Sequence, residues 1–285
     1  MKNISKSVFI SAFPVLAIYS TYYSAMSLSN GFSLDAMGQI LTSSTIVLFF
    51  LGLFIVSQAR TSSGLTGYTI SILIGFLTGM LSTAFLRNWD LDGVAMNVML
   101  TIGWIIYVKW YSVFEERETT ILRIGNMLPE FELENTSKEK VSSSSFLGNP
   151  TIYMFYRGNW CPLCMAQIKE IAGQYKKLEE QGVNMVFVSP QPHFYTERLS
   201  KRYDLGFHYL QDTDNNVAKK LGILSENGIP TGFQALGYDN DTVMPTVIIT
   251  NPKGRIAFAD LTDNYRVRPE PETFFEVIDK MKLVR

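Results

Sequence analysis

The amino-terminal part of the chain is a series of long apolar stretches separated by short polar segments. A helix needs about 20 predominantly apolar residues to cross the core of a bilayer, and four stretches reach that length. Buried helices of a soluble protein would show a polar stripe, whereas the last three stretches carry charge only at their ends. The pattern therefore predicts a membrane domain over residues 1–114, with four transmembrane helices over residues 8–28, 40–58, 67–86 and 93–113.

The basic residues around these stretches predict an orientation in the membrane, because cytoplasmic loops are enriched in Lys and Arg. If the spans alternate in direction, Arg87 lies on one side, and the opposite side holds Lys2, Lys6, Arg60, Lys109, Arg117 and Arg123. We therefore expect a multi-pass membrane protein with its N-terminus and its second domain in the cytoplasm. A cleaved signal peptide fits less well, because the first apolar stretch is too long and no clear small-residue cleavage site follows it.

Polar residues inside the predicted spans are too few for a transport pathway. Asn97 is the only Asn, Asp, Glu or His well inside a span, and no span contains a cysteine. Proton and ion paths use several intramembrane ionisable groups, and thiol-based electron transfer across the bilayer would need cysteines in the spans. We therefore expect these helices to anchor the second domain in the lipid bilayer.

The pattern changes after a polar connector over residues 115–128. From Pro129 onward, runs of strand length alternate with segments of helical periodicity. Strands are predicted over residues 129–135, 151–156, 183–189, 207–212, 246–250 and 255–260, and helices over 165–182, 195–203, 215–221 and 271–283. This order, with a hairpin turn at residues 251–254, predicts an α/β domain over residues 129–285 with a mixed central sheet.

The charge balance excludes one class of partner. Residues 1–113 carry five Lys and Arg against three Asp and Glu, and residues 114–285 carry twenty against twenty-three, which agrees with the net charge of −1 for the chain. Proteins that bind DNA or RNA need a basic excess to contact phosphates, and neither half has one. We therefore expect no nucleic-acid partner.

The only two cysteines of the chain, Cys161 and Cys164, lie at the junction between a predicted strand and a predicted helix. Pro162 fits the first position of that helix, where an N–H group would be unpaired anyway. Free N–H groups and the helix dipole stabilise a thiolate, so we expect a lowered pKa and the attacking sulfur at Cys161. Cys164 lies one turn along, where it can resolve a mixed disulfide.

Structural explanations of the pair fit less well. Cytoplasmic thiols are kept reduced, which disfavours a stabilising disulfide. A zinc site needs four ligands, and the other candidates, His193 and His208, lack the spacing of a zinc finger. We therefore predict redox chemistry by the thiols themselves, with no metal and no other cofactor, since nucleotide and flavin motifs are absent from the sequence.

The sequence YRGNWCPLC at residues 156–164 resembles the thioredoxin superfamily, in which a strand leads into Trp-Cys-x-x-Cys and then into a helix. Together with SPQP at residues 189–192 and MPT at residues 244–246, it is similar to the peroxiredoxin-like AhpC/TSA branch. The resemblance covers about residues 126–285. It implies that Pro245 is a cis-proline facing the cysteines, that Met244 and Thr246 flank a substrate groove, and that Trp160 belongs to a docking surface.

Two departures from these families leave the roles of the cysteines open. Phe155 stands where thioredoxins usually keep a buried Asp, and Cys161 stands where peroxiredoxins usually place Thr or Ser, three residues before the attacking cysteine. Helix position favours attack by Cys161, whereas the peroxiredoxin motif favours Cys164. Arg157 and Asn159 have two interpretations, since they could hold a peroxide or lower a thiol pKa, or could be polar residues of a turn.

Two charged stretches follow later in the chain, GYDNDTVMPT at residues 237–246 and ADLTDNYRVRPEP at residues 259–271. Charged residues of this kind usually form ion pairs on the surface. We give that interpretation to Asp239, Asp241, Asp260, Asp263, Arg266 and Arg268.

The sequence thus predicts a membrane-anchored thiol oxidoreductase whose cysteines cycle between dithiol and disulfide. Its oxidant would be a peroxide, which would make it an antioxidant enzyme, or a disulfide in a partner protein, and an external thiol reductant such as a thioredoxin- or glutathione-like molecule would restore it. Two alternatives remain. One is a binding module that senses redox state without catalysis, and the other is a membrane domain that works under the control of the thiol domain.

Overall fold

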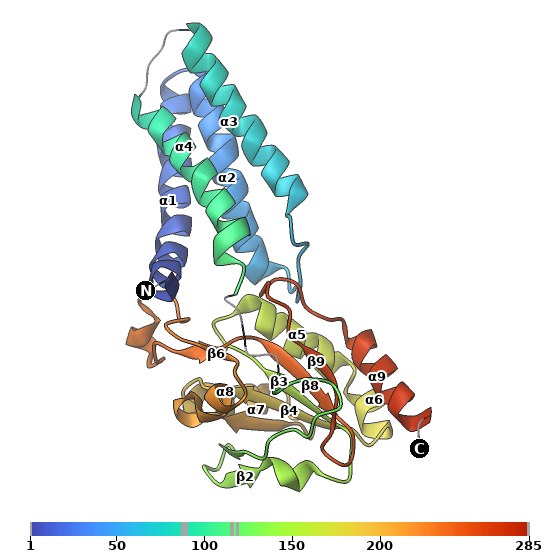
Figure 1. Cartoon of the computed structure of the whole chain (residues 1–285). Helices are drawn as coiled ribbons and strands as arrows, with labels where there is room; N and C mark the ends of the chain where they lie inside the picture. Colours follow the sequence, from blue (N-terminus) through green and yellow to red (C-terminus); the bar gives the residue numbers. More distant parts are fainter. Residues whose placement is uncertain (1, 87–90, 115–116, 118–119, 284–285) are drawn as a thin grey trace.

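The computed structural model describes residues 2–86, 91–114, 117 and 120–283. A bundle of four helices forms the amino-terminal half, and a sheet flanked by helices forms the carboxy-terminal half (Figure 1). The bundle contains α1 (Lys2–Asn30), α2 (Leu34–Ile55), α3 (Thr66–Leu86) and α4 (Leu91–Ile106), and a π-helical segment over Tyr107–Tyr111 extends α4. Arg87, on which part of the orientation argument depends, lies outside the described residues.

Small residues allow α2 and α3 to approach each other closely. A Cβ atom on Gly75 would lie 2.6 Å from Oγ1 of Thr42 and 2.7 Å from the carbonyl oxygen of Gly38. Glycine is therefore required at this crossing, as is common where membrane helices pack. Large apolar side chains such as Leu48, Phe54 and Leu77 are exposed on the outside of the bundle. A lipid-facing surface would have this character.

Three helices are long and apolar enough to cross a membrane, namely those over Asn3–Asn30, Leu34–Ile55 and Asp92–Tyr111. The expected span over residues 67–86 corresponds to α3. Its apolar part with described side chains is the shorter segment Thr66–Ser82, so this criterion supports three spans where the sequence predicted four. That segment is shorter than the roughly 20 residues needed to cross the apolar core, whereas α3 as a whole runs over Thr66–Leu86.

The second half is built on a seven-stranded mixed sheet, as the sequence predicted. The strands lie in the order β2-β1-β5-β4-β3-β8-β9, in which β3, β4 and β5 are parallel and the other pairings are antiparallel. Their bounds are β1 Glu132–Glu134, β2 Lys140–Ser142, β3 Thr151–Phe155, β4 Asn184–Ser189, β5 His208–Gln211, β8 Thr246–Thr250 and β9 Ile256–Asp260. A separate two-stranded ribbon joins β6 (Leu224–Ser225) and β7 (Thr242–Val243).

Helices cover both faces of this sheet, as the fully buried residues of β3 indicate. Ile152 and Met154 of β3 pack in a core with α5, α7 and α9, whereas Tyr153 and Phe155 pack in a second core with α8. The helices are α5 Pro162–Gly173, α6 Tyr175–Glu180, α7 His193–Arg202, α8 Asn216–Lys220 and α9 Pro271–Leu283. Parallel strands with helices on both sides and an antiparallel hairpin at one edge make a thioredoxin-like fold.

Two differences between the structure and the predicted elements concern the cysteine-bearing helix and the edge of the sheet. The single helix expected over residues 165–182 is divided into α5 and α6, because Gln174 has a non-helical backbone between them. Strand β2 forms within a segment that was predicted as a polar loop. It is held there by pairing with β1, with Val141 opposite Leu133 and packed on the second core.

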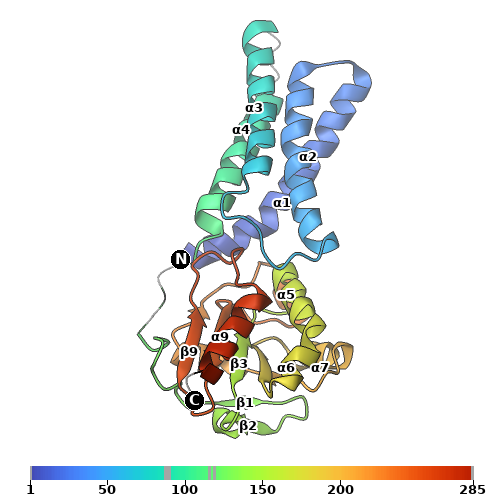
Figure 2. The same ribbon diagram turned by 90° about the vertical axis from the view of Figure 1, so that its right-hand side faces the viewer.

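The helical bundle rests on the thiol domain near α5 (Figure 2). Arg60, in the connection between α2 and α3, forms an ion pair of 2.5 Å with Glu170 of α5. Tyr107, at the end of α4, and Tyr265, after β9, share a hydrogen bond of 2.7 Å between their hydroxyl groups. Leu53 of α2 packs against both the core of the bundle and the core beneath α5. The two halves are therefore in direct contact around the helix that carries the cysteines.

Candidate functional site

The two cysteines are placed by the start of α5. Strand β3 ends at Phe155, and Cys161 is the N-cap of the helix, with its Sγ atom accepting a hydrogen bond of 3.4 Å from the backbone N–H of Cys164. Both residues are free thiols, and their Sγ atoms lie 2.6 Å apart. A disulfide needs a separation of about 2.05 Å, so only a small movement would be needed to join them.

Arg268 is the charged group nearest to both sulfurs. Its Nη2 atom lies 3.4 Å from Sγ of Cys164 and 3.9 Å from Sγ of Cys161. Its Nη1 atom donates to Oε1 of Gln167 at 2.9 Å, and its Nε atom donates to the carbonyl oxygen of Tyr265 at 3.0 Å. The side chain is therefore fixed, with its cationic end directed at the thiol pair and closer to Cys164.

This arrangement lowers the pKa of one cysteine and raises that of the other. Burial by itself would raise the pKa of the Cys164 thiol, but the hydrogen bond with Cys161 and the positive charge of Arg268 lower it to about 5. Burial and the neighbouring sulfur raise the pKa of the Cys161 thiol. The expectation of a lowered pKa at Cys161 is therefore wrong, because Arg268 lies closer to Cys164 and favours the negative charge there.

Both thiols are shielded from solvent. Cys161 is 3 % exposed and Cys164 is fully buried. They belong to a hydrophobic core against which Leu53 from α2 and Tyr265 also pack. The bundle therefore packs against the same core that encloses both sulfurs.

The polar residues of the preceding turn have structural contacts. Arg157 is buried, its guanidinium donates to the carbonyl oxygen of Gly228, and it lies 4.6 Å from the ring centre of Trp160. Asn159 donates to the carbonyl oxygen of Tyr195 in α7 at 3.1 Å. Trp160 packs against Phe233 and also against the core that contains the cysteines. These contacts fix the turn, and Arg157 and Trp160 lie beside each other next to the thiol pair.

The MPT segment lies at the beginning of β8. Every peptide bond among the described residues is trans, so the expected cis bond before Pro245 is wrong. Met244 donates its N–H to the carbonyl oxygen of Ile223 at 2.7 Å, which continues the extended course of β7 into β8. Pro245 and Thr246 nevertheless line a small cavity together with Gln167 and Arg268, so this segment does lie beside the thiol site.

Arg266 and Arg268 were predicted to form surface ion pairs, and this interpretation is wrong. Arg266 is completely buried and Arg268 is 7 % exposed. Both arginines donate hydrogen bonds to residues that are distant in the sequence. Arg266 donates to Thr61 and Ser112, and Arg268 donates to Gln167. No local pattern distinguishes these arginines from surface residues, and for this reason the sequence analysis missed Arg268 and Gln167.

Residues 124–259 match the family model of the AhpC/TSA family. The chain is 25% identical over 165 residues to the thiol-disulfide oxidoreductase ResA of Bacillus subtilis. The aligned region covers 58% of this chain and 79% of that protein. The chain is 30% identical over 102 residues to the chloroplastic peroxiredoxin Q of Sedum lineare, which covers 36% of this chain. The match spans 55% of that peroxiredoxin, about half of the relative's length.

Two solved structures are similar to part of the chain. The match to the crystal structure of AhpC from Enterococcus faecalis covers 56% of this chain and 93% of that protein. Its TM-score is 0.46 and the sequence identity is 17%. The crystal structure of a peroxiredoxin-like protein from Aquifex aeolicus covers 61% and 91%, with a TM-score of 0.47 and 16% identity. Residues 124–259 are therefore similar to the AhpC/TSA family, and the sequence relatives named above are a thiol-disulfide oxidoreductase and a peroxiredoxin.

Proposed function

We propose that this protein is a membrane-anchored peroxidase in which Cys164 attacks the oxidant and Cys161 resolves the product. The observation that carries the proposal is the position of Arg268, whose Nη2 atom lies 3.4 Å from Sγ of Cys164. A thiolate is the reactive form of cysteine, and a pKa of about 5 keeps Cys164 ionised at neutral pH. The raised pKa of Cys161 keeps that residue protonated, as a resolving thiol at rest should be.

The reaction would proceed in two steps. The Cys164 thiolate attacks one oxygen of a hydroperoxide, the O–O bond breaks, and the alkoxide leaves and takes up a proton to become the alcohol, with Cys164 oxidised to a sulfenic acid. The Cys161 sulfur then attacks the sulfenic sulfur, forming the disulfide and releasing water. The 2.6 Å between the two Sγ atoms supports direct resolution within the pair. An external thiol reductant, thioredoxin- or glutathione-like, would return both cysteines to thiols.

A second candidate is thiol–disulfide exchange with a partner protein. The relative ResA of Bacillus subtilis, a thiol-disulfide oxidoreductase by name, is matched over 79% of its length, which favours this candidate. Here the Cys164 thiolate would attack a disulfide of the partner, and Cys161 would resolve the mixed disulfide, leaving the partner reduced. The burial of both sulfurs supports the peroxidase over this alternative, because a small peroxide needs a smaller opening than a protein does.

We propose further that the four helices span a membrane and hold the thiol domain on the cytoplasmic side. Three of them have the length and composition for spanning. The start of α1 and the end of α4 lie at the same end of the bundle, next to the thiol domain, which agrees with an even number of spans (Figure 1). In this arrangement residues 1–114 are the membrane domain, residues 115–128 a linker and residues 129–285 the redox domain.

The proposal can be tested on the full-length protein with cysteine variants. In Cys161→Ser, treatment with hydrogen peroxide should produce a sulfenic acid on Cys164 that reacts with dimedone, measured as a mass increase on the peptide that contains Cys164. In Cys164→Ser, the remaining Cys161 should react only slowly. The opposite assignment of the dimedone adduct would overturn the roles. If neither variant reacts with peroxide faster than a free thiol while the wild type reduces protein disulfides, the exchange activity replaces the peroxidase.

A further inference from the structure

Large aromatic and apolar side chains gather on the surface of the redox domain around a short 3-10 helix, Phe233–Leu236. Phe233 packs on Trp160 with 5.6 Å between the ring centres, and Leu236 is 57 % exposed. We call the group the aromatic patch, and its members are Trp160, Phe194, Tyr195, Phe233, Leu236 and Tyr238. A contiguous exposed apolar group of this kind marks a surface that binds a partner or a membrane.

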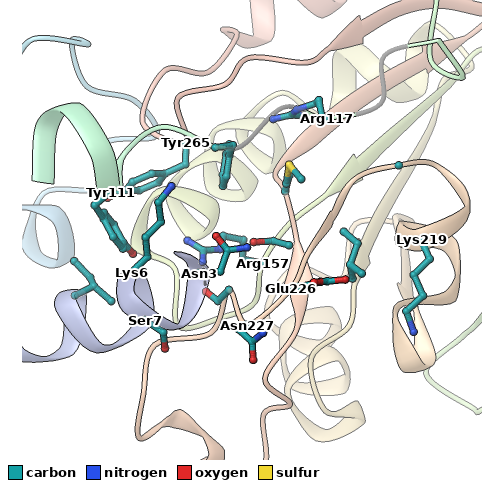
Figure 3. Close-up of a pocket in the computed structure, with 17 residues that line it drawn as sticks. Asn3, Lys6, Ser7, Tyr111, Arg117, Arg157, Lys219, Glu226, Asn227 and Tyr265 are labelled. Atoms are coloured by element: carbon teal, nitrogen blue, oxygen red, sulfur yellow. Dashed lines mark hydrogen bonds between the residues drawn. The ribbon is translucent and has the colours of Figure 1, made fainter. Parts of the chain in front are cut away.

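The segment that carries the patch is joined to α1 by hydrogen bonds. Oγ of Ser11 donates to the carbonyl oxygen of Thr231 at 2.9 Å, and the N–H of Thr231 donates to the carbonyl oxygen of Ser7 at 3.4 Å. Ser7 and Asn227 line one cavity at this junction, which Figure 3 shows in close-up. Residues 227–236 are therefore held against the first turns of α1, where the orange segment lies beside the N-terminus in Figure 1.

These bonds place the segment at the level where α1 becomes apolar. The stretch that predicts the first span begins at Val8, which is 50 % exposed and lies between Ser7 and Ser11 in the sequence. An apolar groove of about 920 Å³ along α1 and α4 is lined by Val8 and Val15, and Thr231 of the redox domain also lines it. When the bundle spans a bilayer, this groove faces acyl chains, so the segment beside it lies at the headgroup boundary.

The composition of the segment is a second, independent observation. Residues 229–238 have the sequence IPTGFQALGY, which contains no charged residue, and Glu226 and Asp239 are the nearest charges in the sequence. Exposed loops ordinarily carry charged side chains, whereas uncharged segments with aromatic and apolar side chains suit the interface between water and lipid. Composition and position therefore indicate the same partner, a lipid surface.

We propose that residues 229–238 anchor the redox domain to the membrane surface, with Phe233 and Leu236 inserted at the boundary between headgroups and acyl chains. The inference rests on the proposed membrane placement of the bundle and not on the proposed peroxidase chemistry. Phe233 packs on Trp160, and Trp160 packs against the core that contains both cysteines. Contact with the bilayer would therefore also hold the turn that precedes α5.

The test uses the full-length protein in phosphatidylcholine vesicles. The double change Cys161→Ser with Cys164→Ser removes both native cysteines, so that Leu236→Cys provides a single site for a polarity-sensitive fluorophore. The vesicles carry a nitroxide near the top or near the end of the lipid acyl chains. The emission should shift to the blue, and the nitroxide near the top of the chain should quench it more strongly, as an interfacial position requires.

Two matched labelling sites define the scale of the measurement. Leu147→Cys replaces an exposed leucine that precedes β3, at the end of the sheet opposite the cysteines, and its label should not be quenched. Leu48→Cys replaces an exposed leucine of α2, and its label should be quenched by both lipids. If the serine background does not fold, Leu236→Trp in the wild-type chain, with brominated acyl chains as the quencher, provides the measurement as quenching in excess of the wild type.

The outcomes separate this inference from the function proposed above. Quenching at Leu48 without quenching at Leu236 would overturn the anchor and leave the aromatic patch to a protein partner, such as the thiol reductant. Equal quenching at Leu147 and Leu236 would also overturn it, because the contact would not be specific to the patch. A label at Leu48 that is not quenched would overturn the membrane placement and the anchor together, whereas oxidation of the wild type by peroxide tests the enzyme separately.

Discussion

Two parts of the chain build the thiol site, helix α5 and the segment 264–269, and they are held in different ways. Helix α5 carries both cysteines and is fixed by its own cap and by the sheet beneath it. The segment 264–269 carries Arg268 and is held by the helical bundle, since Arg266 donates to Oγ1 of Thr61 at 2.9 Å and to Oγ of Ser112 at 2.9 Å. The cysteine pair is therefore positioned locally, whereas the guanidinium beside it depends on contacts between the two domains.

The helical bundle is therefore linked to the thiol site by hydrogen bonds. Arg266 also donates to the carbonyl oxygens of Ser62 and Ser63, and its own carbonyl accepts from the N–H of Thr61 at 2.9 Å. Two residues further on, Arg268 contacts the thiols. A movement of the α2–α3 connection would therefore be transmitted to the guanidinium that stabilises Cys164.

The largest effect is expected from removing the activating charge. In Arg268→Gln, the pKa of the Cys164 thiol should rise because its cationic neighbour is lost. At about pH 6 the rate of alkylation by iodoacetamide should fall roughly 10- to 100-fold. Arg268→Lys keeps a positive charge and should retain part of the rate, which separates electrostatics from packing. Equal rates in the wild type and in Arg268→Gln would show that Arg268 does not activate the thiol.

A smaller effect on reactivity, with a cost in stability, is expected for Arg266→Gln. This change leaves several buried acceptors without their charged donor, which should destabilise the protein by roughly 3 kcal/mol. The thermal midpoint should fall, and alkylation of Cys164 should also slow because Arg268 is less well held. Arg198→Gln, an arginine on helix α7 away from the domain contact, is the control and should change neither quantity. A stability loss with an unchanged pH profile of alkylation would confine Arg266 to a structural role.

The smallest effect is expected for Tyr265→Phe. The change removes the hydrogen bond between the hydroxyl groups of Tyr265 and Tyr107 but keeps the ring that packs on Tyr111. A single hydrogen bond of this kind contributes about 1 kcal/mol, so the thermal midpoint should fall only slightly. A loss comparable to that of Arg266→Gln would mean that the domain contact depends on the tyrosine pair instead of on the arginine.

Much of the redox domain could be predicted from the sequence because its signals are local. The alternation of strands and helices placed β3, β4, β8 and α9 within a residue or two, and Pro162 after Cys161 identified the start of α5. The four helices of the bundle followed from apolar length in the same way, although three of them meet the length and composition for a membrane span. These features depend on neighbouring residues, which a single sequence displays directly.

The electrostatics of the site could not be predicted, because they depend on residues that are distant in the sequence. Arg268 is 104 positions after Cys164, and its burial follows from the packing of the segment 264–269 between α5 and the bundle. The position of Cys161 at the helix start predicted the lowered pKa there through the local dipole alone. A full guanidinium charge nearer to Cys164 outweighs those partial charges.

The most direct test of the account is the pH dependence of alkylation, measured separately for each cysteine by mass spectrometry on the reduced full-length protein. Between about pH 4 and about pH 9, the Cys164 rate should be constant at neutral pH and should fall only as the pH drops through about 5, where the thiolate becomes protonated. Cys161, with its raised pKa, should remain slow up to alkaline pH. A Cys164 rate that rises only near pH 8.5, the range of an ordinary thiol, or a low-pH rate that belongs to Cys161, would contradict the account.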